Sequence, residues 1–327
     1  MTTVFGVPIQ ALLSQLLVGL INGSFYALLS LGLAIIFGLL NIVNFAHGAL
    51  YMLGALGAWL LLEHLGIGYW PALIVSPLAV GLFGALIERT MLKRIRGLDP
   101  IYGLLLTFGL ALVIQGVARN YFGVSGEPYD MPPQLSGGKN LGFMFLPNYR
   151  TWVVLVSVLI CAANWFVIER TRLGSYLRAS TENPLLVQAF GINVPRLITL
   201  TYALGVALAA LAGVMAAPIY RVSPLMGSDL IIVVFAVVVI GGMGSIFGSI
   251  LTGFALGVIE GLTKVYYPEA SSTVVFVIMA LVLMVKPAGL FGRTACPRRS
   301  RPRRLVRSAG APARGTRCAL CASRWRS

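Results

Sequence analysis

Long apolar blocks separated by short polar stretches run along most of the chain. Seven blocks approach or exceed the roughly 20 residues that a helix needs to cross a bilayer, and few charged residues lie inside them. The pattern therefore predicts an all-α polytopic membrane protein. The seven blocks are residues 10–39, 46–62, 70–92, 101–121, 152–168, 197–220 and 246–265.

Two further apolar blocks are shorter, at residues 230–240 and 274–285. The first spans roughly 16 Å as a helix, about half a bilayer, and the second approaches a full span when it is extended to 271–286. We expect residues 230–240 to cross as a thin half-span rather than to form a re-entrant segment. The total is then about eight or nine transmembrane or half-membrane helices.

Basic residues cluster in two connections between the blocks. Because short cytoplasmic loops are enriched in Lys and Arg, both connections are predicted to be cytoplasmic. The loop 122–150 and the N-terminus then lie outside, and the C-terminus lies inside if 230–240 crosses. A cleavable signal peptide is not expected, since no basic residue occurs in the first ten. The clusters are Arg89, Lys93, Arg94 and Arg96 in the first connection, and Arg170, Arg172, Arg178 and Arg196 in the second.

The composition agrees with a membrane protein, because 58% of residues are apolar and only 11% are charged. The net charge of +15 is uneven: ten of the 25 Lys and Arg lie in residues 294–327 with no acidic residue, so the remainder carries 15 against 10. Residues 1–293 are thus predicted to be a transmembrane domain. The Arg-rich tail, 294–327, is expected to be disordered or a misread C-terminus, with binding of anionic lipid as the functional alternative; no nucleic-acid partner is expected.

Enzyme chemistry is not expected. His47 and His64 are the two histidines, and the chain has no HExxH, GxSxG or P-loop motif. We therefore expect no cofactor and no metal site in this chain, and any use of ATP would need a partner subunit.

Charged residues inside the spans are almost absent. Glu260 lies near the end of its block and is predicted to pair with Lys264 at i+4. Because proton and sodium relays use buried charges, this scarcity argues against ion-coupled transport, although it leaves a passive channel open.

Neutral polar groups are a better candidate for function. Asn41, Asn44 and His47 recur at three-residue intervals and are predicted to share a helix face. Such groups more often hold helices together than touch substrate, and we favour that role. The alternative is a weakly polar translocation path for a neutral or zwitterionic solute.

Glycines predict both close packing and chain breaks. Four-residue spacing lets helix backbones approach in lipid, and we favour packing within one subunit over a dimer interface. Interruptions at residues 241–244 and at Asn22-Gly23 indicate a translocation path, although a simple loop between two short helices explains the first one equally well. The residues concerned are Gly248, Gly253, Gly257 and Gly261 for packing, and Gly241, Gly242 and Gly244 for the break.

The strongest local signal lies in the second basic connection, residues 170–196. Asn183 suits an N-cap, Pro184 the first helical position and Gly191 the C-terminal cap. The short helix between them is predicted to carry an apolar stripe, which either folds back on the bundle, lies in the lipid interface or fills a groove on a partner protein. The stripe consists of Leu185, Leu186, Ala189 and Phe190.

Several motifs in order resemble the permeases of branched-chain amino acid ABC transporters, most closely the shorter of the two paralogous permeases. They are Asn41 to Gly48, Leu173 to Ile192 and Val239 to Gly248, and the resemblance covers about residues 12–292. It implies an ABC importer with a second permease as a heterodimer, two ATP-binding subunits and a periplasmic or extracellular binding protein, in the bacterial cell (inner) membrane. Arg178 and the helix around 184–190 would then form the segment that couples to the ATPase.

The chain departs from the family pattern in two places. Leu185, Leu186 and Val187 stand where an acidic residue and two alanines often follow Asn-Pro, and the Arg-rich tail has no counterpart. The resemblance predicts a permease subunit for leucine, isoleucine, valine or similar small amino acids. A urea or short-amide permease of the same family, or a stand-alone transporter or channel, is the alternative.

Overall fold

The computed structural model describes residues 3–4, 7–40, 43–140, 142 and 144–292. The chain divides into residues 1–293 and 294–327, and the second part lies outside the described residues. The Arg-rich tail and Asn41 are therefore sequence predictions without a structural counterpart.

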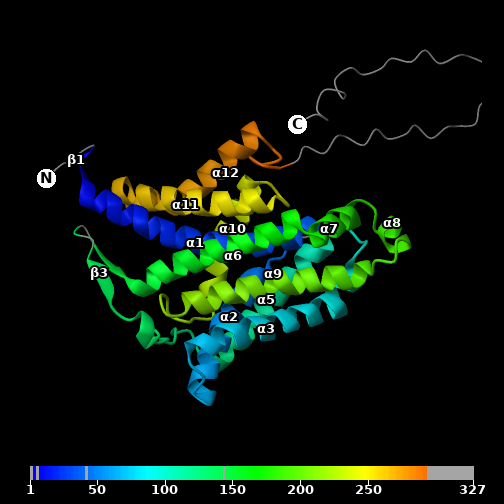
Figure 1. Cartoon of the computed structure of the whole chain (residues 1–327), viewed down its shortest axis with the longest axis horizontal. Helices are drawn as coiled ribbons and strands as arrows, with labels where there is room; N and C mark the ends of the chain where they lie inside the picture. Colours follow the sequence, from blue (N-terminus) through cyan, green and yellow to red (C-terminus); the bar gives the residue numbers. More distant parts are fainter. Residues whose placement is uncertain (1–2, 5–6, 41–42, 141, 143, 293–327) are drawn as a thin grey trace, which may run out of the picture. The chain divides into compact units, whose positions relative to one another are not determined.

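Nine helices carry the predicted apolar blocks in the part of the chain that the structure describes (Figure 1). Seven are long and apolar enough to cross a membrane, and two are shorter, which confirms the predicted eight or nine. The long helices are α1 (Ile9–Leu40), α2 (Ala46–Leu65), α3 (Tyr69–Ile87), α5 (Pro100–Phe122), α6 (Asn148–Arg170), α9 (Val194–Ala216) and α11 (Ile246–Tyr266). The shorter ones are α10 (Met226–Gly241) and α12 (Val274–Val285).

Smaller elements lie between these helices. A π-helical turn, η1 (Glu88–Leu92), and α4 (Lys93–Ile95) continue α3, and 3-10 turns occupy η2 (Pro133–Leu135) and η3 (Pro268–Ala270). Two short antiparallel strand pairs join β1 (Thr3–Val4) with β2 (Val7–Pro8) and β3 (Gly138–Asn140) with β4 (Phe145–Pro147). The basic connection after α6 folds as α7 (Arg172–Glu182) and α8 (Pro184–Ala189).

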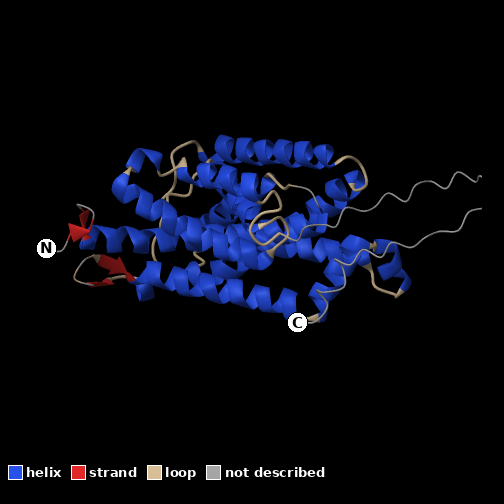
Figure 2. Ribbon diagram, turned by 90° about the horizontal axis from the view of Figure 1, so that it is seen from above, coloured by secondary structure: helices blue, strands red, loops and turns tan. Residues whose placement is uncertain are grey.

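The helices run between two ends of one bundle (Figures 1 and 2). We call the end that holds β3 and β4 the hairpin end, and the opposite end, which holds α7 and α8, the α8 end. Helix α1 runs through the interior, since 83% of an apolar 18-residue stretch of it is buried, whereas α6 lies on the outside with 17% of such a stretch buried. Both predicted cytoplasmic connections lie at the α8 end.

Helix α10 packs against α1, α2, α11 and α12. Before it, Val222 exchanges backbone hydrogen bonds with Glu127 of the long loop at the hairpin end. After it, Gly244 lies against Gly38 near the end of α1. The 16 residues of α10 rise about 24 Å, more than the predicted half-span because residues 226–229 extend the helix. The crossing of residues 230–240 as a half-span stays a prediction.

The predicted interruption at Asn22-Gly23 is wrong, because α1 is continuous through both residues. A Cβ on Gly23 would lie 3.1 Å from the Phe254 Cα, so the glycine serves close contact with α11. The amide oxygen of the Asn22 side chain accepts a hydrogen bond of 3.0 Å from the Tyr220 hydroxyl. This bond gives the polar side chain a partner without a break in the helix.

The glycines of α11 pack against α1 within the subunit. A Cβ on Gly253 would lie 2.7 Å from the Ala27 backbone, and one on Gly261 would lie 2.8 Å from the Gly19 Cα. Gly257 meets the backbone of Gly23 in the same row. This contact confirms the packing prediction over a dimer interface. Gly248 belongs to a second contact, against the carbonyl of Gly241 in α10.

Candidate functional site

Helix α8 has the caps that its sequence predicts. The Asn183 side chain accepts a hydrogen bond of 3.1 Å from the Leu186 backbone N–H, and Pro184 occupies the first turn. Gly191 follows the helix at φ +80°, a left-handed conformation that favours glycine, and its N–H donates to the Gln188 carbonyl at 2.9 Å. These local bonds hold a helix of six residues in a defined place.

The predicted apolar stripe of α8 faces away from the bundle. Leu185 and Phe190 are each 77% exposed and Leu186 is 56% exposed, and Ala189 is exposed beside them. The interpretation that these residues fold back on the bundle is therefore wrong. Val187 is the residue of α8 that packs on the bundle, because it is buried against Val194 and Ile198 of α9. The lipid interface and a partner groove remain the two surroundings that fit this stripe.

Helix α7 is fixed to the end of α6 by a tight turn. A Cβ on Gly174 would overlap the Ile168 carbonyl, so this position requires glycine. The Arg178 guanidinium donates to the Glu169 carboxylate at 3.0 Å across the turn. Both side chains are nearly half exposed, so the pair contributes little stability and remains free to rearrange.

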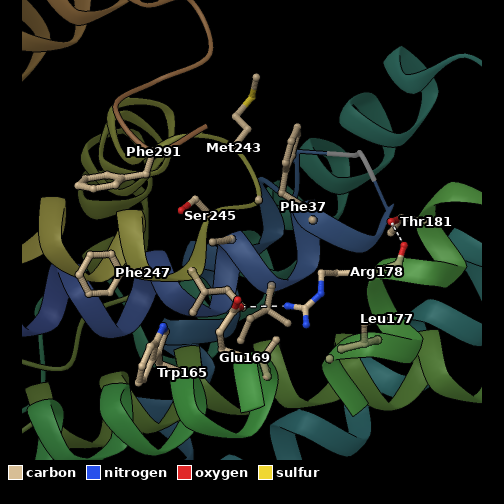
Figure 3. A pocket seen from close by; sticks show the side chains of 17 residues that line it. Phe37, Trp165, Glu169, Leu177, Arg178, Thr181, Met243, Ser245, Phe247 and Phe291 are labelled. Atoms are coloured by element: carbon tan, nitrogen blue, oxygen red, sulfur yellow. Dashed lines mark hydrogen bonds and ion pairs between the residues drawn. The ribbon is translucent and has the colours of Figure 1, made fainter. Parts of the chain in front are cut away.

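A pocket of about 550 Å³ opens between α7, the end of α1 and the α10–α11 connection (Figure 3). In Figure 3, Trp165 and Glu169 of α6 lie opposite Phe247 of α11, and Arg178 reaches toward Glu169 from α7. The predicted coupling residue Arg178 and the predicted break residue Gly244 thus line one pocket. The other lining residues include Phe37, Leu177, Thr181, Met243, Ser245 and Phe291.

The break between α10 and α11 is covered by protein. Gly242 has φ +101° and would clash with the Gly292 backbone if it carried a Cβ. The N–H groups of Leu290 and Phe291 donate to the carbonyls of Ile240 and Gly241 at 2.8 and 3.2 Å. The last carbonyls of α10 are therefore satisfied by the segment after α12, in agreement with the rule that irregular backbone at membrane depth needs such cover.

Asn44 and His47 do not share a helix face, contrary to the sequence prediction. Helix α2 begins at Ala46, and Asn44 precedes it, so the regular spacing does not reflect one helix. The Asn44 side chain accepts from the Ala46 backbone N–H at 3.1 Å and donates to the Tyr202 hydroxyl at 3.1 Å. It therefore starts α2 and ties it to α9.

His47 is fully buried within the subunit. Its Nε2 lies 3.1 Å from the Leu29 carbonyl of α1, and Nδ1 has no partner among the described residues. Asn44 is equally enclosed, with 1% of its surface exposed. These contacts favour the role of holding α1, α2 and α9 together over direct contact with a solute in this conformation.

The one predicted charge pair within the spans is present. The Lys264 Nζ lies 2.7 Å from the Glu260 carboxylate, and the Tyr26 hydroxyl donates to the second oxygen at 2.8 Å. Glu260 therefore joins α11 to α1 near the hairpin end.

Sequence reasoning missed the aromatic wall of the pocket, formed by Phe37, Trp165, Phe247 and Phe291. The first three read as ordinary apolar residues of their spans, and Phe291 as one in the segment after the last apolar block. No local spacing connects them, because they come from four separate segments.

A helical bundle with seven helices long and apolar enough to cross a membrane is the architecture of a multi-pass membrane protein. The sequence profile of the family described as "Branched-chain amino acid transport system / permease component" matches residues 15–285. This chain belongs to that family.

Similarity to individual members extends over nearly the whole bundle. The high-affinity branched-chain amino acid transport system permease protein BraD of Pseudomonas aeruginosa is 31% identical over 296 residues, covering 86% of this chain and 96% of BraD. LivH of Escherichia coli strain K12 is 30% identical over 302 residues, with the same coverage.

The LivM permease protein of the same strain is 29% identical over 295 residues but is covered over only 68% of its length. The chain is thus of the shorter, LivH type, as the sequence predicts. A solved structure, PsaBC from Streptococcus pneumoniae in complex with Fab, is 16% identical with a TM-score of 0.41, covering 85% of this chain and 89% of that one.

Proposed function

We propose that this chain is the permease subunit of a binding-protein-dependent ABC importer for leucine, isoleucine, valine or similar small amino acids. It forms the translocation path with a paralogous permease as a heterodimer in the bacterial cell (inner) membrane. Two ATP-binding subunits drive transport, and a periplasmic or extracellular binding protein delivers the solute. The names of the LivH and BraD relatives support the substrate class.

The exposed apolar face of α8 is the observation that carries this proposal. Leu185, Leu186 and Phe190 stand out from the bundle on a capped helix, and Val187 beneath them is buried. A short helix that presents apolar side chains fits a hydrophobic groove on a partner protein. We assign that groove to the ATP-binding subunit, because this chain has no P-loop of its own.

The proposed orientation in the membrane rests on the basic residues at the α8 end. Both basic connections lie at the α8 end, and short basic connections are a mark of the cytoplasmic side. In this orientation the N-terminus is outside, the loop 122–150 faces the binding protein, and Lys286 and the C-terminus are cytoplasmic.

ATP-dependent uptake tests the coupling role. The complex is reconstituted with its binding protein in proteoliposomes, with Leu186→Asp/Phe190→Asp in this chain. We expect loss of co-purification of the ATPase and loss of leucine uptake, because a buried anchor in a protein groove is worth at least about 2 kcal/mol. Gln188→Asp is the matched control, since it adds a charge to the same exposed helix outside the stripe and leaves both measurements near those of the unaltered complex.

The same preparation separates the competing classes. Leucine uptake by this chain alone, without ATPase or binding protein, would assign it to stand-alone transporters or channels. ATPase-dependent uptake of urea in place of leucine would assign it to the amide permeases.

A further inference from the structure

A second pocket, of about 390 Å³, opens at the α8 end between the end of α3 and the start of α9. Four cationic side chains line it: Arg89 and Lys93 from the π-helical turn and α4, Arg96 just beyond, and Arg196 from the first turn of α9. We call it the basic pocket. Glu88 is the single acidic residue in its lining.

Glu88 does not neutralise this group of cations. Its carboxylate is buried, and one oxygen pairs with the Arg96 guanidinium while the other accepts from the Thr199 hydroxyl at 2.5 Å. Among the described residues Arg89, Lys93 and Arg196 form no ion pair. The pocket therefore carries three uncompensated positive charges.

One further feature favours an anion in the basic pocket. It lies at the N-terminus of α9, a helix of 23 residues whose positive dipole end favours negative charge.

An exposed apolar row leads from the basic pocket along α9. Arg196, Leu200 and Leu204 are spaced by four residues and so share one helix face. Leu200 is 69% exposed and Leu204 41% exposed, and both lie within a membrane-spanning helix. A cationic pocket with an apolar strip running from it into the membrane matches a phospholipid, whose charged headgroup continues into acyl chains.

We propose that the basic pocket binds the phosphate of an anionic phospholipid headgroup, with an acyl chain along Leu200 and Leu204. Basic pockets between helices on the cytoplasmic side are suited to anionic headgroups, whereas a soluble phosphate would gain nothing from the apolar row. This inference rests on the multi-pass placement of the chain and stands whether or not the transport proposal holds.

Competition between lipids tests the site. The full-length chain, with any co-purifying subunits, is placed in nanodiscs of phosphatidylcholine and phosphatidylglycerol in equal amounts, and the lipids retained after mild detergent extraction are measured by native mass spectrometry. The variant Arg89→Gln/Lys93→Gln/Arg196→Gln removes the three uncompensated charges and leaves the Glu88–Arg96 pair intact. Arg94→Gln/Arg170→Gln/Arg172→Gln is the matched control, since it removes three charges at the same end outside the pocket.

We expect the unaltered chain to retain phosphatidylglycerol over phosphatidylcholine. In the pocket variant the ratio of the two retained lipids should fall at least about tenfold, because each Lys or Arg near an anionic surface strengthens binding about fivefold. The control variant should keep the original ratio. Equal losses in both variants would overturn the pocket and leave a diffuse surface charge.

Inorganic phosphate identifies the source of the anion. Added phosphate that stabilises the unaltered chain and not the pocket variant, with no lipid preference, would overturn the lipid assignment. If the triple variant aggregates, Lys93→Gln/Arg196→Gln provides the same comparison with a smaller expected loss, and unchanged retention in that variant would also contradict the proposal.

Discussion

The backbone N–H of Leu290 donates a hydrogen bond of 2.8 Å to the carbonyl oxygen of Ile240. Fifty residues of chain thus return to close the end of α10. The neighbouring bond from Phe291 to Gly241 makes the segment after α12 part of the same closure.

Truncation distinguishes this closure from the tail. A chain that stops after Gly289 loses both donors, and we expect a lower thermal midpoint of unfolding. Each hydrogen bond contributes about 1 kcal/mol, and its loss leaves a carbonyl of α10 without this partner. A chain that stops after Arg293 should keep its midpoint and its uptake. If the chain that stops after Arg293 inserts normally and is normally abundant but no longer supports uptake, the Arg-rich tail is required.

Alanine at two glycines tests the packing of α11 on α1. Gly257 lies against the backbone of Gly23, so we expect Gly257→Ala to destabilise the protein by about 1–3 kcal/mol through overpacking. Gly116 in α5 has open space around it, and Gly116→Ala should be neutral or stabilising by up to about 1 kcal/mol. Denaturation in mild detergent gives the comparison, and equal effects at both sites would contradict the close contact.

A double-mutant cycle measures the bond between Asn44 and Tyr202. We expect Asn44→Ala and Tyr202→Phe to show a coupling free energy of about 0.6 kcal/mol and at most about 1.7 kcal/mol, the mean and the maximum found for hydrogen bonds between membrane helices. Because both side chains are enclosed, the KM for the solute should stay near its original value in either single variant. A large change in KM with unaltered stability would instead place Asn44 on the translocation path.

Substitution of Arg178 separates stability from coupling. Since its ion pair with Glu169 is nearly half exposed, Arg178→Gln should change the free energy of unfolding by no more than about 1 kcal/mol. Transport should fall, because Arg178 lies where α7 meets the pocket beside the α10–α11 break. Arg172→Gln, in the same helix outside the pocket, is the control. Uptake that is unchanged in both variants would remove Arg178 from the coupling segment.

The spans were predictable because their length and apolar composition are imposed by the bilayer, and the start of α11 at Ile246 agrees to the residue. The caps of α8 were predictable for a different reason. Asn183, Pro184 and Gly191 act within a single turn of their own positions, so their neighbours in sequence suffice.

The errors arose where distant segments decide the structure. Asn22-Gly23 suggests a break in sequence, but α1 is continuous there because the glycine packs against α11. The regular spacing of Asn44 and His47 suggests one helix, but α2 begins at Ala46, after Asn44. The pocket combines Trp165 with Phe247, which belong to separate helices. Tertiary contact of this kind leaves no periodic signal in the sequence.

The attachment of α8 has a mechanical consequence. Val187 rests on Val194 and Ile198, in the first turns of α9, and α9 packs along α1, α2 and α3 through the middle of the bundle. A load applied to the outer face of α8 would pass to the base of that central helix through Val187, and to α7 through the contacts between the two short helices. A smaller side chain at position 187 would weaken the first of these two routes.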